Sequence, residues 1–162
     1  MSEILDRPTS VLPSRFGYLM ALYAENYTRL ARLFAPHRLV SGHFVSDPGG
    51  DGFEVHMHVL EKHRYTLELD LSYGFVDERT GLPTPSAQVR VYTDARQAEA
   101  WHCEPGRHLW QVLGPFPEAH TVMQHRLRMN SFLNRWLEYL AEQGHSIGTL
   151  ERIDEPVRLR CG

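Results

Sequence analysis

Two histidines separated by one residue, His56 and His58, are the side chains best suited to chemistry in this sequence. On a β-strand, side chains at positions i and i+2 project from the same face, so the two imidazoles would be presented together. A carboxylate on the neighbouring strand, Glu68 or Asp70, would complete the three-ligand pattern of catalytic zinc. The sequence therefore predicts one of two arrangements. One is a site for zinc or another divalent metal at His56, His58 and Glu68, and the other is a solvated sheet face on which histidines pair with carboxylates.

Arg90, Tyr92 and Asp94 form a second group, at the end of a predicted strand and in the turn after it. A tyrosine hydroxyl and a carboxylate in this position can bind a polar ligand or orient a proton donor. The structural alternative is that Asp94 caps the backbone of the turn, while Tyr92 packs and its hydroxyl finds a local partner. We treat the three residues as ligand-binding candidates.

Two asparagines, Asn26 and Asn130, lie at the apolar stripes of the two predicted helices. A buried amide destabilises the fold unless it is hydrogen-bonded. Each amide either bonds a strand edge or the other helix and so fixes helix placement, or helps to line a polar pocket between the helices and the sheet. Asn26 and Asn130 are therefore also ligand-binding candidates.

Two amphipathic helices and a run of strands must position these residues. In residues 121–144, apolar side chains recur at i, i+3, i+4, i+7, i+8 and i+11, which is one stripe of an α-helix, and Gly144 supplies its end. A second helical pattern begins at Ser14 and is closed by Pro36. Strand patterns lie between the helices, at residues 39–46, 53–60, 64–71, 87–93, 97–103 and 107–113.

The hairpin formed by 53–60 and 64–71 decides which carboxylate faces which histidine. Pairing inward residues with inward residues requires an odd number of loop residues, because a shift by one residue turns a strand over. A loop at 61–63 places His56 opposite Glu68. The same loop moved one residue along places His58 opposite Glu68 and His56 opposite Asp70.

A run of strands with helices at both ends is typical of the α+β class. We expect one domain at 14–145, in which an antiparallel sheet of about five strands is covered on one face by the N-terminal helix and the long C-terminal helix. Residues 1–13 are predicted to be a flexible arm, 74–86 a long loop, and 146–162 a tail with at most one short strand, at 157–159. The second sheet face would be exposed to water or bound to a partner.

Composition excludes several classes of function. The net charge of −3 argues against binding to nucleic acid, which relies on clustered positive charge. No apolar run approaches the ~20 residues that cross a bilayer, and the N-terminus lacks the pattern of a signal peptide. The two cysteines, Cys103 and Cys161, do not suggest a disulfide framework, so we expect a cytoplasmic protein. No phosphate-binding loop and no G-x-S-x-G motif occurs.

The runs 90–101 (RVYTDARQAEAW) and 128–144 (RMNSFLNRWLEYLAEQG) resemble the YqiB-like bacterial proteins, a family of unknown function. The first predicted helix is also similar, so the resemblance spans roughly 14–145. The chain departs from the family pattern at Thr93, where the family has a histidine. It departs again at 124–126, where the family has an acidic pair and a lysine. The resemblance implies a bacterial protein but brings no activity, cofactor or catalytic residue.

Two functions fit these observations. The first is a non-catalytic binding or accessory protein that holds a protein partner or a small molecule, as a monomer or a homodimer. It would use the exposed sheet face, the 74–86 loop or a groove beside the C-terminal helix. The second is a small metal-dependent or acid–base enzyme that uses His56, His58 and Glu68, or Tyr92 and Asp94. We favour the first, because no recognisable catalytic constellation occurs.

Overall fold

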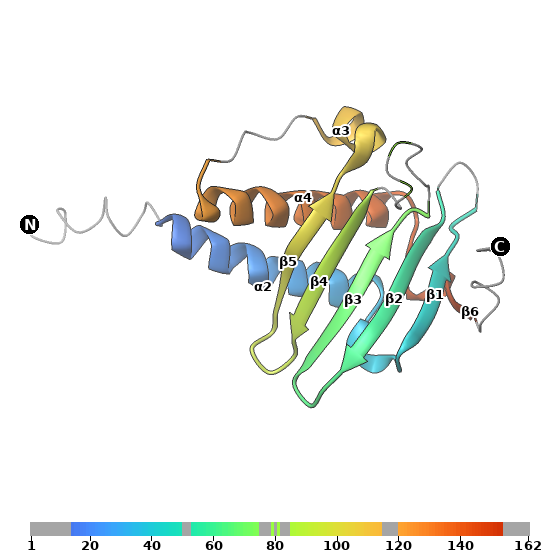
Figure 1. Ribbon diagram of the computed structural model, residues 1–162. Helices are drawn as coiled ribbons and strands as arrows, with labels where there is room; N and C mark the ends of the chain where they lie inside the picture. Colours follow the sequence, from blue (N-terminus) through green and yellow to red (C-terminus); the bar gives the residue numbers. More distant parts are fainter. Residues whose placement is uncertain are drawn as a thin grey trace, which may run out of the picture.

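One antiparallel sheet with helices packed against one of its faces makes up the computed structural model, which describes residues 14–49, 53–74, 79, 81, 85–114 and 120–153 (Figure 1). The elements follow one another in the order α2 (Arg15–Leu33), η1 (Pro36–Arg38), β1 (Gly42–Ser46), β2 (Val55–Lys62), β3 (Thr66–Ser72), β4 (Ser86–Tyr92), β5 (Gln97–Glu104), α3 (Gly106–Leu113), α4 (Val122–Glu142), η2 (Ile147–Thr149) and β6 (Leu150–Ile153). The predicted α+β class is confirmed.

Helix α2 begins and ends where the sequence supplies caps. The Ser14 hydroxyl accepts a hydrogen bond from the backbone N–H of Gly17 at 3.0 Å, which satisfies one of the free donors of the first turn. At the other end, Ala35 adopts a left-handed conformation with φ of 46°, and Pro36 prevents a further helical turn. Local sequence signals therefore mark both ends of this helix.

Helix α4 is capped and buries a continuous apolar stripe. Thr121 and Gln124 form a capping box, in which each side chain bonds the backbone of the other residue. Trp136 has no exposed surface, and its ring meets that of Tyr73 edge-on with centroids 5.4 Å apart. The described helices α2 and α4 pack against each other and against β5. They lie behind the sheet in the view of Figure 1.

The sheet has six strands in the order β5-β4-β3-β2-β1-β6, and every neighbouring pair is antiparallel. Five strands follow one another as a meander, and β6 pairs with the outer side of β1. The sheet is therefore one strand larger than the expected five, because part of the predicted tail 146–162 forms β6. The strand predicted at 157–159 lies outside the described residues, as do the arm 1–13 and most of the loop 74–86.

One predicted strand was wrong, since residues 107–113 lie within helix α3. Leu109, Val112 and Leu113 are spaced i, i+3 and i+4, which fits a helix as well as a short strand. Gly106 has φ of +72°, a conformation that suits glycine, and it turns the chain out of β5. Leu109 is completely buried and anchors this helix to the core.

Both hairpin registers expected from the sequence were also wrong. His58 pairs with Asp70 and His56 pairs with Ser72, whereas Glu68 pairs with Glu61. The backbone N–H of His63 donates to Thr66 at 2.8 Å, which closes a turn with only two residues inside it. The register shifts between Val59 and Glu61, so an extra residue, Leu60, sits in β2. This bulge restores the inward pairing that a two-residue loop would otherwise break.

Candidate functional site

The sheet face turned away from α2 and α4 (Figure 1) carries five of the eight residues selected for their chemistry, namely His56, His58, Glu68, Arg90 and Tyr92. Alternate residues of each strand point into the core, and the residues between them point to this second face. We call it the open face. Its chemically active side chains are His43, His56, His58, Glu68, Asp70, Gln88, Arg90, Tyr92, Glu99 and Trp101.

Arg90 lies at the centre of the first cluster on the open face. Its Nη2 lies 3.2 Å from Oε2 of Glu68, the residue directly opposite on β3. The guanidinium also lies over the ring of Trp101, 5.9 Å from its centroid. An exposed ion pair adds only ~0–1 kcal/mol to stability. The contacts therefore matter chiefly because they hold the guanidinium in one place.

Glu99 extends this cluster by accepting a hydrogen bond from Tyr92 and by lying close to Tyr23. The Tyr92 hydroxyl donates to Oε1 of Glu99 at 2.7 Å, and Tyr23 of α2 lies within electrostatic reach of the same carboxylate. Burial, followed by Glu99, raises the pKa of Tyr23 to about 12, and the same causes raise the pKa of Tyr92. Both hydroxyls are therefore protonated donors at neutral pH. We call Glu68, Arg90, Tyr92, Glu99 and Trp101 the arginine cluster.

Asp94 does not join this cluster through Tyr92. Its Oδ1 accepts a hydrogen bond from the backbone N–H of Ala95 at 2.9 Å, in the turn between β4 and β5. This is the backbone contact of the structural alternative. Ligand binding by Asp94 stays a prediction.

Three histidines form the second cluster on the open face. Nε2 of His43 lies 2.9 Å from Nδ1 of His56, close enough for one nitrogen to donate to the other. The rings of His43 and His58 are in contact, with centroids 3.9 Å apart and ring planes inclined by 32°. Gly74 makes room for His56, because a Cβ at Gly74 would lie 2.8 Å from Cδ2 of that ring. Sequence reasoning missed His43, which becomes a neighbour only through the pairing of β1 with β2.

Asp70 faces His58 across the β2–β3 pair. Burial lowers the pKa of His58 and raises that of Asp70, although each group partly offsets the effect on the other. The Oδ1 atom of Asp70 is buried and accepts no hydrogen bond within the part of the chain that the structure describes. We call His43, His56, His58 and Asp70 the imidazole cluster.

The predicted metal ligands are only partly brought together. His56 and His58 lie in the imidazole cluster, whereas Glu68 belongs to the arginine cluster. Among the described residues, no group of three or more His, Cys, Asp or Glu side chains is arranged to hold a metal ion. Metal binding by His56, His58 and Glu68 therefore stays a prediction.

Asn130 lies away from the open face and is completely buried. Its Oδ1 accepts from the backbone N–H of Ala100 at 2.7 Å, and its Nδ2 donates to the backbone oxygen of Ala100 at 3.1 Å. The same Nδ2 donates to the backbone oxygen of Arg126 at 2.9 Å. The amide thus pairs with β5 as a neighbouring strand would.

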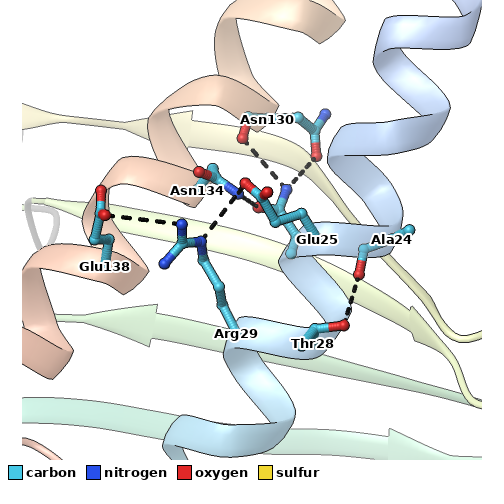
Figure 2. Close-up of polar contacts among 8 residues, drawn as sticks. Ala24, Glu25, Thr28, Arg29, Asn130, Asn134 and Glu138 are labelled. Carbon is cyan, nitrogen blue, oxygen red and sulfur yellow. Dashed lines mark hydrogen bonds and ion pairs between the residues drawn. The ribbon is translucent and has the colours of Figure 1, made fainter.

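Asn26 connects α2 to the same point. Figure 2 shows the side chains of Glu25, Asn130 and Asn134 in this region. Its Nδ2 donates to the backbone oxygen of Asn130 at 3.3 Å, and its Oδ1 accepts from Nδ2 of Asn134 at 3.0 Å. Asn134 also donates to Glu25 at 2.7 Å. The amides of Asn26 and Asn130 are therefore occupied by protein partners in this structure, and ligand binding by them stays a prediction.

Comparison with known families decides where the chain belongs. Residues 29–146, more than half of the chain, match DUF1249, a family described as protein of unknown function. The chain belongs to the DUF1249 family. The DUF1249 match contains both clusters of the open face and all of α4, whereas β6 lies beyond it. No curated protein and no solved structure matches the chain.

None of the described helices is long and apolar enough to cross a membrane.

Proposed function

We propose that this DUF1249 protein is a non-catalytic, cytoplasmic binding protein of the YqiB-like bacterial kind, and that it holds a protein partner on the open face. The observation that carries the proposal is the arginine cluster. Trp101 is 46% exposed, although its strand mates Ala98 and Ala100 are buried. The exposed part of this large ring, beside the Arg90 guanidinium, is surface that a partner could cover, and such burial of apolar area would favour binding.

The residue types of the arginine cluster are those that dominate binding energy at protein interfaces. Tryptophan, tyrosine and arginine are enriched among hot-spot residues. Arg90 is already held by Glu68 and Trp101, so it would lose little conformational freedom when a partner binds. Arginine and tryptophan would supply contact area, and the surrounding carboxylates would supply polar contacts.

The charges of the open face favour a protein over a nucleic acid. Glu68, Asp70 and Glu99 lie near Arg90 on adjacent strands. A phosphate backbone would be repelled by these carboxylates and attracted by only one of the residues in the arginine cluster. A folded protein surface of mixed charge meets such a face with less repulsion.

Site-specific cross-linking in cells tests the proposal. Gln88 lies on β4 opposite Asp70 and next to both clusters, so a photo-reactive residue there should link to one defined protein. The same group at Ala24, exposed on the outer side of α2, is the matched control. Trp101→Ala combined with Arg90→Ala should abolish the link from Gln88, with unchanged thermal melting.

Three outcomes of this experiment are distinct. A partner captured from Gln88 but not from Ala24, and lost in the double variant, supports the proposal. A link to a second copy of the chain would make the open face a homodimer interface instead. Equal links from Gln88 and Ala24, or none from Gln88, would overturn it.

The juxtaposition of His43 and His56 favours one second candidate, a metal-dependent enzyme. Imidazole nitrogens are good ligands for zinc. In a calorimetric titration of chelator-treated protein, zinc should then bind with about one-to-one stoichiometry. The heat of zinc binding should be absent in His56→Ala. A calorimetric trace without binding heat would end this candidate.

A further inference from the structure

A cavity of about 190 Å³ lies on the helix side of the sheet, between the end of β5 and the first half of α4. Both clusters of the open face lie outside it. Its lining divides into two parts by polarity. The apolar residues Met129 and Phe132, which are buried, and Cys103, which is half-buried, form the inner part, and the polar residues Arg128, which is half-buried, and Glu104 and His125, which are exposed, form the outer part.

The inner part of the cavity is uncharged. Phe132 is 1% exposed and Met129 is 8% exposed. The Cys103 thiol lies 3.7 Å from the backbone oxygen of Met129, to which it donates. Burial, with a smaller contribution from Glu104, raises the pKa of this thiol well above its usual range. The thiol therefore stays protonated and offers a small apolar surface rather than a nucleophile.

The outer part of the cavity carries both signs of charge. His125 and Arg128 are three residues apart on α4, so their side chains lie on one side of the helix. Across the ranges that the structure describes, the side chains of His125, Arg128 and Glu104 form no hydrogen bond and no ion pair. Uncommitted donors beside an apolar hollow are the usual chemistry of a small-ligand site.

We propose that this cavity binds a small organic acid. The carboxylate would bond Arg128 and His125, because a guanidinium and an imidazole N–H both donate to an anion. The apolar body would lie on Met129 and Phe132. Glu104 would accept a hydrogen bond from a hydroxyl or amino group at the far end of the ligand.

The size of the cavity limits the ligand. Sites for drug-sized molecules enclose roughly 300–1,000 Å³, so 190 Å³ suits an acid with a single ring or a short chain. The inference is independent of the proposed function, because the cavity and the open face lie on opposite sides of the sheet.

Methyl resonances of methionine provide the test. The chain has five methionines, and Met129 lines the cavity, so its methyl signal reports occupancy directly. The full-length protein, labelled at methionine methyl carbons, is titrated with 4-hydroxybenzoate. The Met129 signal, assigned by its loss in Met129→Leu, should shift and saturate, whereas signals of the distant methionines should not move.

Two comparisons decide whether charge recognition is involved. The neutral analogue 4-hydroxybenzamide should bind at least about tenfold more weakly, and so should the acid to Arg128→Gln, since a lost charged hydrogen bond has this effect. Arg126→Gln, a neighbouring substitution outside the cavity lining, should leave the affinity unchanged. The proposal is overturned if the Met129 signal does not shift at 10 mM acid, which is about the weakest affinity of practical use. Equal affinity for the acid and the amide would also overturn it.

Discussion

The side-chain amide of Asn130 bonds both backbone groups of Ala100, so a residue of α4 closes part of the outer edge of β5. An uncovered strand edge invites pairing with another chain. The amide bonds the backbone N–H and the backbone oxygen of Ala100. The same two bonds fix the position of α4 along β5.

We expect Asn130→Ala to destabilise the fold by at least about 2 kcal/mol, because two buried backbone groups lose their partners. Asn130→Asp should also destabilise it, since a carboxylate cannot donate to the Ala100 and Arg126 oxygens. Urea unfolding measures both. A loss below about 0.5 kcal/mol, the range of ordinary surface substitutions, would contradict the assigned role.

Asn26→Leu distinguishes a structural amide from a ligand-binding one. The substitution removes the donor to the Asn130 backbone and the acceptor for Asn134. A loss of about 2 kcal/mol corresponds to a fall of about 4–8 °C in Tm for a chain of this size. Thr28→Ala, on the exposed side of the same helix, is the control. Unchanged melting of Asn26→Leu would favour the pocket alternative.

Trp136 is buried and Trp101 is partly exposed, so their truncation should change the stability of the fold by very different amounts. Trp136→Ala should cost about 3–5 kcal/mol, because the ring is completely buried in the core. Trp101→Ala should change stability by no more than about 0.5 kcal/mol. Thermal melting of both variants checks the difference. A large loss in Trp101→Ala would assign that ring a packing role and weaken the proposed interface.

The stability of the protein should fall as the pH is lowered below neutrality, and His58 should contribute to the fall. Its pKa is lowered by burial, so between the folded and unfolded pKa values the unfolded chain binds more protons. The contribution is present above the ordinary histidine pKa of about 6.5 and is lost as the pH falls towards the folded value.

His58→Gln should therefore show a smaller loss of unfolding free energy between pH 7.5 and pH 5.5 than the wild type. Asp70 has the opposite sign, because burial raises its pKa and the folded state binds the extra proton. His145 and His37, whose pKa values are also lowered, remain in both proteins and cancel in the comparison. His63→Gln, an exposed substitution, is the control. If the unfolding free energies of the wild type and His58→Gln depend equally on pH, His58 does not contribute to the loss of stability.

Local sequence signals were enough to predict α4 and the open face. The stripe through Phe132, Leu133 and Trp136 has a single period, and Gly144 marks its end, so no long-range information was needed. The alternation in β2 and β3 likewise placed His56, His58 and Glu68 on one face. Both signals arise from periodicity, which tertiary contacts reinforce rather than change.

Neighbour relations between strands were not predictable in the same way. The bulge at Leu60 shifts the β2–β3 pairing by one residue for the pairs farther from the turn. Asp70 rather than Glu68 therefore faces His58. His43 joins the histidines only because β1 lies beside β2. Helix α3 was missed because the apolar residues of a segment as short as 107–113 fit both a helical and a strand period.

The position of β6 has a consequence for the order in which the molecule can assemble. The meander of five strands can form while the chain emerges from a ribosome, but β1 meets its second neighbour only after residue 153 has been made. Such a distant pairing raises the contact order and slows the last step of folding. Until then the backbone of residues 43–46 is open along one side, beside the histidines, and a chain shortened to residue 149 would keep that exposed strand permanently.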